Sequence, residues 1–167
     1  MTAGVALTVA LTLMLIELGV SVRNERRLRA RGALTPRDPV YKLMRVAYPG
    51  TFVLMALEGW WSGPAPRRLL LAGIAIVIAG KLLKAWAIAV LDGRWTYRVL
   101  VLPGEPLVTR GPYRWLRHPN YVGVVAELVG FAMIVQARWS GVVAVLFFGE
   151  LLRRRIQAEE AALGLSR

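Results

Sequence analysis

The sequence predicts an all-α integral membrane protein with about five transmembrane helices, a long cytosolic loop and a C-terminal helix. Hydrophobic residues make up 56 % of the 167 residues, above the share usual in soluble domains, and they recur in long runs. Lys and Arg outnumber Asp and Glu by 22 to 10, which gives a formal charge of +12. A soluble nucleic-acid binder would carry that charge without the apolar excess, so no nucleic-acid partner is expected.

The first predicted helix covers the apolar run from Thr2 to Val22. About 20 helical residues cross the ~30 Å hydrocarbon core of a bilayer, so this run is long enough to span it. A cleaved signal peptide is the alternative, but no basic residue precedes the run and the arginines follow it, so we expect a retained helix. The basic run Arg23–Gly32 comes next, and the prolines of Thr35–Pro39 break any helix that continues from it.

Two further spans are predicted before the long loop. Val46–Trp61 is a weaker apolar segment that Pro49–Gly50 and Glu58 interrupt, so it either crosses the membrane or forms a re-entrant pair. Ser62–Pro66 is a turn because it is rich in Gly and Pro. Leu69–Leu91 is long and apolar enough for a complete span.

The last two spans follow a polar loop, Asp92–Pro119, that is too long to be an ordinary connection. Asn120–Gln136 forms the fourth predicted helix, and Arg138 marks a tight turn after it. Trp139–Leu152 begins the fifth helix, which continues into the cytosol as far as Leu163.

The positive charges predict the orientation in the membrane. With the N-terminus outside and the C-terminus cytosolic, 17 of the 22 cations lie inside, and only Arg67, Arg68 and Arg138 lie outside. Arginine outnumbers lysine by 19 to 3, which hints at a prokaryotic cell membrane. We expect one multi-pass domain, with N-terminal helices over residues 1–91 and the loop, a helical hairpin and the C-terminal helix over residues 92–167.

The composition excludes several kinds of chemistry. There is no cysteine, so disulfides, thiolate nucleophiles and Cys-ligated zinc or iron–sulfur sites are excluded. There is one histidine, His118, so a multi-histidine metal site is excluded as well. We therefore expect no metal site.

Four carboxylates fall within the apolar segments: Glu17, Glu58, Glu127 and Glu150. Ionisable groups in lipid cost several kcal/mol, so such residues usually face the interior of a helix bundle. One interpretation is that they pair with Lys81, Lys84 or each other. The other is contact with a ligand, and Glu58 and Glu127 are the candidates for substrate binding.

The stretch Gly111–Gly123 gathers Arg, Tyr, Trp and His at the inner edge of the fourth predicted helix. Pro119 suits the start of a helix, and Tyr121 lies one turn from His118 on the same side. A ring nitrogen and a phenol can therefore share one pocket at the membrane surface. A belt of interfacial aromatic and basic anchors is the alternative interpretation.

A second group of polar residues lies in the C-terminal helix, where Arg155 and Glu159 are neighbours at i and i+4. A solvated charged face is the structural alternative for this pair. The long loop and this helix end emerge on the same cytosolic face, and both flank the hairpin of the fourth and fifth helices. A polar cofactor could lie between them while an oily substrate enters from the bilayer.

Three motifs resemble the hallmark of the isoprenylcysteine carboxyl methyltransferase family: Gly111–Tyr113, Arg117–Tyr121 and Arg155–Glu160. In that family an Arg-His-Pro-x-Tyr stretch follows Gly-x-Tyr, and Arg-x-x-x-Glu-Glu follows a helical hairpin. The resemblance covers about the last 75 residues, from Trp95 on. It implies an integral membrane methyltransferase that uses S-adenosylmethionine as its cofactor, held at the long cytosolic loop.

The resemblance also implies roles for individual residues. Arg155 would be the catalytic residue that orients the acceptor group of the substrate, and Glu159 would bind the ammonium group of the cofactor. In relatives the cofactor-binding stretch is often polar at its start, and in this chain Glu105 and Pro106 occupy that position. The other implied cofactor-binding residues are Glu105, Pro106, Leu107, Val108, Tyr113, His118, Pro119, Asn120 and Tyr121.

The sequence leaves the methyl acceptor open. The family name implies a prenylated cysteine carboxylate, but a short prokaryotic chain also resembles relatives that methylate the hydroxyl groups of alkylpyrones or alkylresorcinols. Phospholipid N-methyltransferases share the Arg-His-Pro-x-Tyr pattern, so a phospholipid amine is a third possibility. In each case the partners are a lipophilic or prenylated small molecule and the lipid bilayer.

Two other functional classes stay open. Membrane sterol and steroid reductases bind NADPH and carry a similar Arg-His-Pro-Asn-Tyr stretch, but they are usually longer, and Arg-x-x-x-Glu-Glu favours the methyltransferase. A non-catalytic membrane scaffold would bind neither cofactor. The oligomeric state is not indicated.

Overall fold

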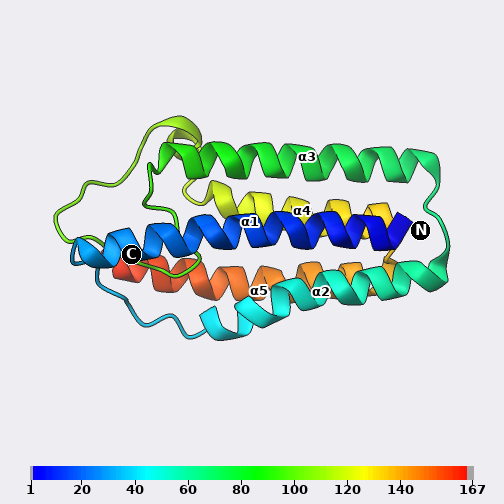
Figure 1. Ribbon diagram of the computed structural model, residues 1–167, viewed down its shortest axis with the longest axis horizontal. Helices are drawn as coiled ribbons and strands as arrows, with labels where there is room; N and C mark the ends of the chain where they lie inside the picture. Colours follow the sequence, from blue (N-terminus) through cyan, green and yellow to red (C-terminus); the bar gives the residue numbers. More distant parts are fainter. Residues whose placement is uncertain (1, 165–167) are drawn as a thin grey trace.

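Residues 2–164 fold into five long α-helices that lie side by side in an elongated bundle (Figure 1). The computed structural model describes residues 2–164. Its elements are α1 (Thr2–Ala30), α2 (Tyr41–Ser62), α3 (Arg67–Val90), the 3₁₀ helix η1 (Gly111–Arg114), α4 (Pro119–Val135) and α5 (Arg138–Ala162). Within the described residues all regular structure is helical, apart from an isolated antiparallel bridge between Leu34 and Val101. The predicted all-α class is confirmed.

The first two helices are longer than the apolar runs that predicted them. α1 continues through the basic run to Ala30 and ends before Gly32, whose φ of 83° lies in the left-handed region that favours glycine. α2 begins at Tyr41, where Asp38 Oδ1 accepts hydrogen bonds from the backbone N–H groups of Val40 and Tyr41 at 3.2 and 3.1 Å. A carboxylate in this place satisfies N–H groups that have no partner inside the helix.

The interrupted apolar segment belongs to a single helix. α2 runs without a break from Tyr41 to Ser62, with Pro49 inside it. The re-entrant pair that residues 46–61 could have formed is therefore absent, and α2 and α3 meet at the turn 63–66.

α3 and α4 pack almost backbone to backbone because glycines face each other across the contact. A Cβ atom on Gly130 would lie 2.7 Å from the carbonyl oxygen of Gly73. One on Gly123 would lie 3.0 Å from the carbonyl oxygen of Gly80. Small residues at such spacings allow a closer helix contact than larger side chains permit, as is common in membrane helices.

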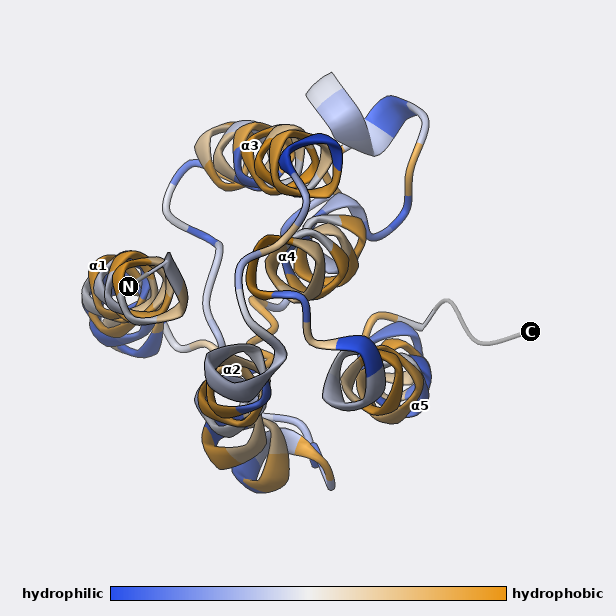
Figure 2. Ribbon diagram, turned by 90° about the vertical axis from the view of Figure 1, so that its right-hand side faces the viewer, coloured by the Kyte–Doolittle hydropathy of each residue, from blue (hydrophilic) through white to orange (hydrophobic). Residues whose placement is uncertain are grey.

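α4 lies in the middle of the bundle and contacts the four other helices. Figure 2 looks along the helices and shows α1, α2, α3 and α5 around it. Its apolar side chains Leu128 and Phe131 are buried, and Phe131 lies 4.7 Å from Phe52 of α2 between ring centroids. Phe148 of α5 completes this core. The helix that carries the His118–Tyr121 motif is therefore the most firmly packed one.

The outward faces of the bundle are strongly apolar. Leu15 of α1 and Leu146 of α5 have 66 % and 70 % of their surface exposed, which water disfavours and a bilayer accepts. By length and composition α1 and α3 could each cross a membrane, and α4 is a shorter apolar helix. These features suggest a membrane protein, and five complete spans stay a prediction.

Both long connections lie at one end of the bundle, together with the end of α5 (Figure 1). The first joins α1 to α2 and the second, residues 91–118, joins α3 to α4. The N-terminus and the short α2–α3 and α4–α5 turns lie at the opposite end. The predicted juxtaposition of the long loop and the C-terminal helix is confirmed.

Candidate active site

A cavity of about 440 Å³ opens at the end of the bundle where the two long loops lie. This volume falls within the range usual for small-molecule sites. One part of its wall is polar and includes Tyr113, His118, Asn120, Tyr121, Arg155 and Glu159. Another part is apolar and includes Leu11, Met14, Leu18, Met44, Val124 and Phe148. The cavity can therefore hold a molecule with a polar and an oily part.

The centre of the polar wall is a hydrogen-bonded chain of three side chains. Arg155 Nε donates to the Tyr121 hydroxyl at 2.9 Å, and that hydroxyl donates to Glu159 Oε2 at 2.6 Å. Arg155 and Glu159 face the cavity together because they are one turn apart on α5. Tyr121 reaches them from the first turn of α4. The sequence predicted each residue for the site, and the structure adds that Tyr121 joins the other two.

His118 lies just before α4, in the N-cap position, and Pro119 is the first helical residue. The His118 ring stacks on the Tyr121 ring with centroids 5.4 Å apart, so the two side chains share a pocket as predicted. His118 Nε2 lies 3.2 Å from Glu160 Oε1, and Nδ1 lies 3.8 Å from Glu159 Oε2. The histidine thus holds the carboxylate pair of α5 against the start of α4.

Tyr113 belongs to η1, which packs closely on the end of α3. A Cβ atom on Gly111 would lie 2.7 Å from a methyl group of Val90, and its φ of 61° also favours glycine. Burial, together with the nearby charge of Glu159, raises the pKa of Tyr113. Its phenol therefore stays protonated and can donate a hydrogen bond into the cavity.

Arg155 is held by residues that the sequence did not single out. Its Nη1 lies 3.0 Å from Asp38 Oδ2, and its Nη2 donates to the backbone carbonyl of Tyr97. The Arg155 and Asp38 side chains are 7 % and 5 % exposed. Asp38 lies in the stretch that predicted only a helix break, and no spacing rule relates it to an arginine so far along the chain.

Four of the expected cofactor residues do not line the cavity: Glu105, Pro106, Leu107 and Val108. Glu105 instead forms ion pairs with Arg31 after α1 and with Arg94, at the start of the long loop. Arg94 also donates to the carbonyl of Pro106 at 3.0 Å. This segment therefore fastens the long loop to the end of α1.

Glu17 and Glu127, two of the carboxylates of the apolar segments, pair with two lysines, in line with the structural interpretation of these residues. Lys81 lies 2.8 Å from each carboxylate, and Lys84 lies 2.6 Å from Glu17 and 3.1 Å from Glu127. The Tyr48 hydroxyl donates to Glu127 at 3.1 Å. Lys84 and Tyr48 line the cavity, so Glu127 lies behind its wall.

Glu58 and Glu150 lie elsewhere. Glu58 accepts hydrogen bonds from the backbone N–H groups of Trp139 and Ser140 at 3.0 and 2.7 Å, so it caps the start of α5 at the opposite end of the bundle. Glu150 pairs with Arg153 and Arg154 on the exposed side of α5. The structure does not bring Glu58 to the cavity that holds Arg155.

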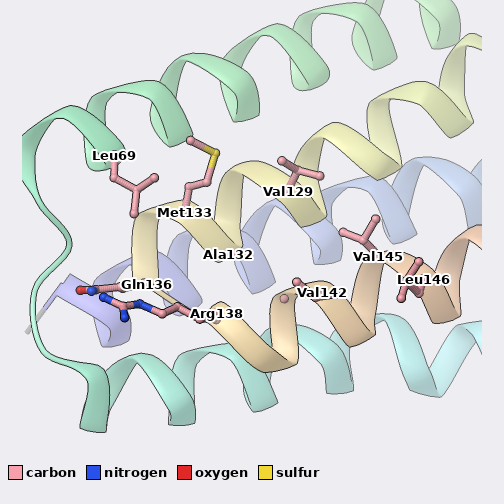
Figure 3. Close-up of a pocket in the computed structure, with 11 residues that line it drawn as sticks. Leu69, Val129, Ala132, Met133, Gln136, Arg138, Val142, Val145 and Leu146 are labelled. Carbon is pink, nitrogen blue, oxygen red and sulfur yellow. The ribbon is translucent and has the colours of Figure 1, made fainter.

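A second, shallower groove of about 380 Å³ lies near the α4–α5 turn (Figure 3). Its walls are apolar side chains of α3, α4 and α5, including Leu69, Met133 and Leu146, and Gln136 and Arg138 lie at its edge. It carries no cluster of polar groups that could align a reaction. The candidate active site is therefore the cavity at the loop end.

Comparisons with known proteins bear on this site. The model of the isoprenylcysteine carboxyl methyltransferase (ICMT) family matches residues 73–164, which include all three site motifs. The chain is 29 % identical over 147 residues to the uncharacterized protein YpbQ of Bacillus subtilis, with 88 % of each chain covered. It is 25 % identical over 154 residues to an uncharacterized protein of Haemophilus influenzae, with 92 % of this chain and 90 % of that protein covered.

A more distant similarity links the chain to an enzyme. It is 32 % identical over 94 residues to the rat protein-S-isoprenylcysteine O-methyltransferase, which covers 55 % of this chain and 33 % of the rat protein. No solved structure matches the chain.

Proposed function

The chain belongs to the isoprenylcysteine carboxyl methyltransferase family, and on this premise we propose that it transfers a methyl group from S-adenosylmethionine to a lipid-like acceptor in the membrane. The observation that carries the proposal is the Arg155–Tyr121–Glu159 chain of hydrogen bonds in the wall of a cavity that is part polar and part apolar. All three residues belong to motifs within the matched region.

The residues of the polar wall fit S-adenosylmethionine. The cofactor carries an ammonium group, which the Glu159 carboxylate could bind, and a sulfonium, which the faces of Tyr113 and Tyr121 could stabilise. Asn120 Oδ1 is buried and has no hydrogen-bond partner among residues 2–164, so it is available to a donor on the cofactor. We propose these residues, with His118, as the cofactor site.

When bound, the cofactor supplies an already activated methyl group, so the main task of the protein is to align donor and acceptor. Arg155 is suited to hold the acceptor oxygen, because its guanidinium is always protonated and is fixed in place by Tyr121. A carboxylate is already deprotonated, and a hydrogen bond from the guanidinium to a phenol or enol oxygen favours its deprotonated form. The acceptor class is therefore an oxygen nucleophile on a lipophilic molecule.

The apolar part of the cavity indicates how that molecule enters. Leu11 and Leu18 belong to α1, Met44 belongs to α2, and all three line the cavity beside the polar groups. We propose that the chain crosses the membrane five times, with the N-terminus outside and the loop end of the bundle at the cytosolic surface. An oily tail can then reach the cavity from the bilayer while the cofactor arrives from the cytosol.

Thermal unfolding of the detergent-purified protein with added cofactors tests this proposal. A ligand that binds only the folded state raises Tm. We expect S-adenosylhomocysteine to raise Tm and NADPH to leave it unchanged. The reverse result would indicate a reductase, and no effect of either compound would indicate a non-catalytic scaffold.

A variant of Glu159 tests whether this single residue contributes to cofactor binding. Glu159→Gln removes the charge that would meet the ammonium group, and we expect it to weaken S-adenosylhomocysteine binding about tenfold. Arg154→Ala is the matched control, because Arg154 lies on the same helix, pairs with Glu150 and is exposed. Equal binding by the Glu159→Gln variant and the wild-type protein would contradict the site assignment.

A further inference from the structure

Two arginines lie near the ring of Tyr41, the first residue of α2, and a third follows Tyr41 on the same helix. The Arg98 guanidinium lies 4.6 Å from the centre of the Tyr41 ring, and that of Arg155 lies 5.9 Å from it. Arg45 is one helical turn after Tyr41 and so lies on the same side of α2. All four residues line the cavity. Their charges decide what this part of the wall can bind.

The charge of Arg155 is already balanced inside the protein. Asp38 Oδ2 lies 3.0 Å from Arg155 Nη1, and both side chains are almost fully buried. Asp38 is itself fixed, since its other oxygen caps α2. The other two guanidinium nitrogens of Arg155 donate to the Tyr121 hydroxyl and the carbonyl of Tyr97. Arg155 can orient a neighbouring oxygen, but it brings no unbalanced charge to an acidic ligand.

The charge of Arg98 is only partly balanced. Its Nε lies 3.6 Å from Glu25 Oε1, beyond hydrogen-bond distance, and is buried without a hydrogen-bond partner among residues 2–164. The same Glu25 oxygen accepts two hydrogen bonds from Arg29, at 3.0 and 2.7 Å. One carboxylate thus serves two arginines, which leaves an excess of positive charge beside Tyr41.

Arg45 increases that excess. It is exposed on the first turns of α2, and none of the ion pairs within residues 2–164 involves it. Leu18 and Met44 line the same cavity, so oily and cationic groups share one wall. A ligand with an acidic group on an apolar tail matches this arrangement.

We propose that Arg45 and Arg98 form an anion-binding subsite for a carboxylate or phosphate carried by the lipid-like acceptor. The subsite holds the acidic group beside Tyr41, and Arg155 orients the oxygen that reacts. The inference rests on the proposed function, because it takes the cavity to be the acceptor site. The carboxylate of the methyl donor is the other possible source of an anion, and binding experiments separate the two.

The test compares two probes with the same tail, N-acetyl-S-farnesylcysteine and its methyl ester, which differ by one negative charge. Binding of each to the detergent-purified protein is measured with and without Arg45→Ala and Arg98→Ala. We expect the wild-type protein to bind the acid about tenfold more tightly than the ester, since a charge-assisted contact contributes about that much. The double variant should bind the two probes within about threefold of each other.

Three controls make the outcome specific. Lys42 follows Tyr41 in the sequence but does not line the cavity. Lys42→Ala removes its charge and should leave the preference for the acid unchanged. Arg45→Lys in the Arg98 wild-type background should retain most of the preference, because it retains the charge. S-adenosylhomocysteine should bind the double variant within about twofold of the wild-type affinity, since the subsite serves the acceptor.

Two results would overturn the subsite. A preference for the acid that survives in the double variant would show that other residues bind the anion. A loss of S-adenosylhomocysteine affinity equal to the loss for the acid would assign Arg45 and Arg98 to the donor instead. If the wild-type protein prefers the acid but binds no S-adenosylhomocysteine, the subsite stands and the proposed methyltransferase function fails.

Discussion

At the scale of single residues, Arg155 connects the two halves of the chain. Tyr121 fixes it from α4, while Asp38 and the backbone of Tyr97 fix it from the two loops. Arg155, Tyr121 and Glu159 belong to motifs of the family, but Asp38 lies outside the region that the family model matches. The orientation of the proposed catalytic residue therefore depends on a part of the chain that carries no motif.

Substitution of Asp38 tests this dependence. Asp38→Ala leaves Arg155 as a buried cation without its partner and uncaps α2, and we expect it to lower the free energy of unfolding by about 3–5 kcal/mol. Asp38→Asn should cost about 1 kcal/mol less, because an amide oxygen still caps the helix. Chemical unfolding in detergent measures both.

Glu150→Gln is the control for the Asp38 variants. It breaks ion pairs of an exposed carboxylate, and such pairs contribute less than about 1 kcal/mol. An Asp38→Ala variant as stable as the Glu150→Gln variant would show that the Asp38–Arg155 pair does not hold the two halves together.

At the scale of the elements, the contact between α3 and α4 places the proposed cofactor site. α4 presents His118 and Tyr121 at its first turn, and η1 presents Tyr113 from the end of α3. Glycines on both helices allow their backbones to approach closely. The position of α3 relative to α4 therefore sets the distance between Tyr113 and the groups on α4.

A methyl group between these helices should destabilise the bundle. Gly130→Ala places a Cβ atom 2.7 Å from the Gly73 carbonyl oxygen and from a Val77 methyl group, and we expect it to lower the free energy of unfolding by about 1–3 kcal/mol. Gly149→Ala in α5 meets no atom within 4 Å and should be neutral or stabilising, because alanine favours helix. Thermal unfolding in detergent compares the two, and equal Tm values would contradict the close α3–α4 contact.

The sequence predicted which helices form more accurately than it predicted the residues at which they begin and end. Apolar runs indicated all five helices, because their length and hydropathy are local properties. α1 nevertheless extends into the basic run, and α2 begins before its apolar segment, since charged residues that reach an aqueous loop can still be helical. Pro49 suggested an interruption of α2, but packing against α1, α4 and α5 keeps the helix continuous.

The site was predictable where its residues lie in one motif and not where distant segments meet. Arg155 and Glu159 share a helix turn, so their proximity followed from spacing alone. Glu105 and Glu58 had no such constraint, and the fold places Glu105 against Arg31 and Glu58 at the start of α5. Arg98 and Tyr41 meet only through the packing of a loop on α2.

At the scale of the whole molecule, the charge of +12 has a clear distribution. The loop end of the bundle carries Arg45, Arg98 and Arg155 around the cavity, and most of the remaining arginines lie in the helix ends and connections at that end. Glu17, Glu127, Lys81 and Lys84 balance one another in the interior. The surplus of positive charge therefore lies where the proposal places the cytosolic surface and the entrance for an acidic lipid.

Methyl transfer into lipid tests the central claim most directly. The protein is reconstituted in vesicles made from the lipids of cells that naturally produce it, and radiolabelled S-adenosylmethionine is added. The radioactivity incorporated into the extracted lipids is then measured. We expect the wild-type protein and Arg154→Ala to transfer label, and Arg155→Ala to transfer about 100-fold less, because the acceptor loses the group that orients it. Equal transfer by the Arg155→Ala variant and the wild-type protein, or no transfer by any of the three, would contradict the proposed methyltransferase site.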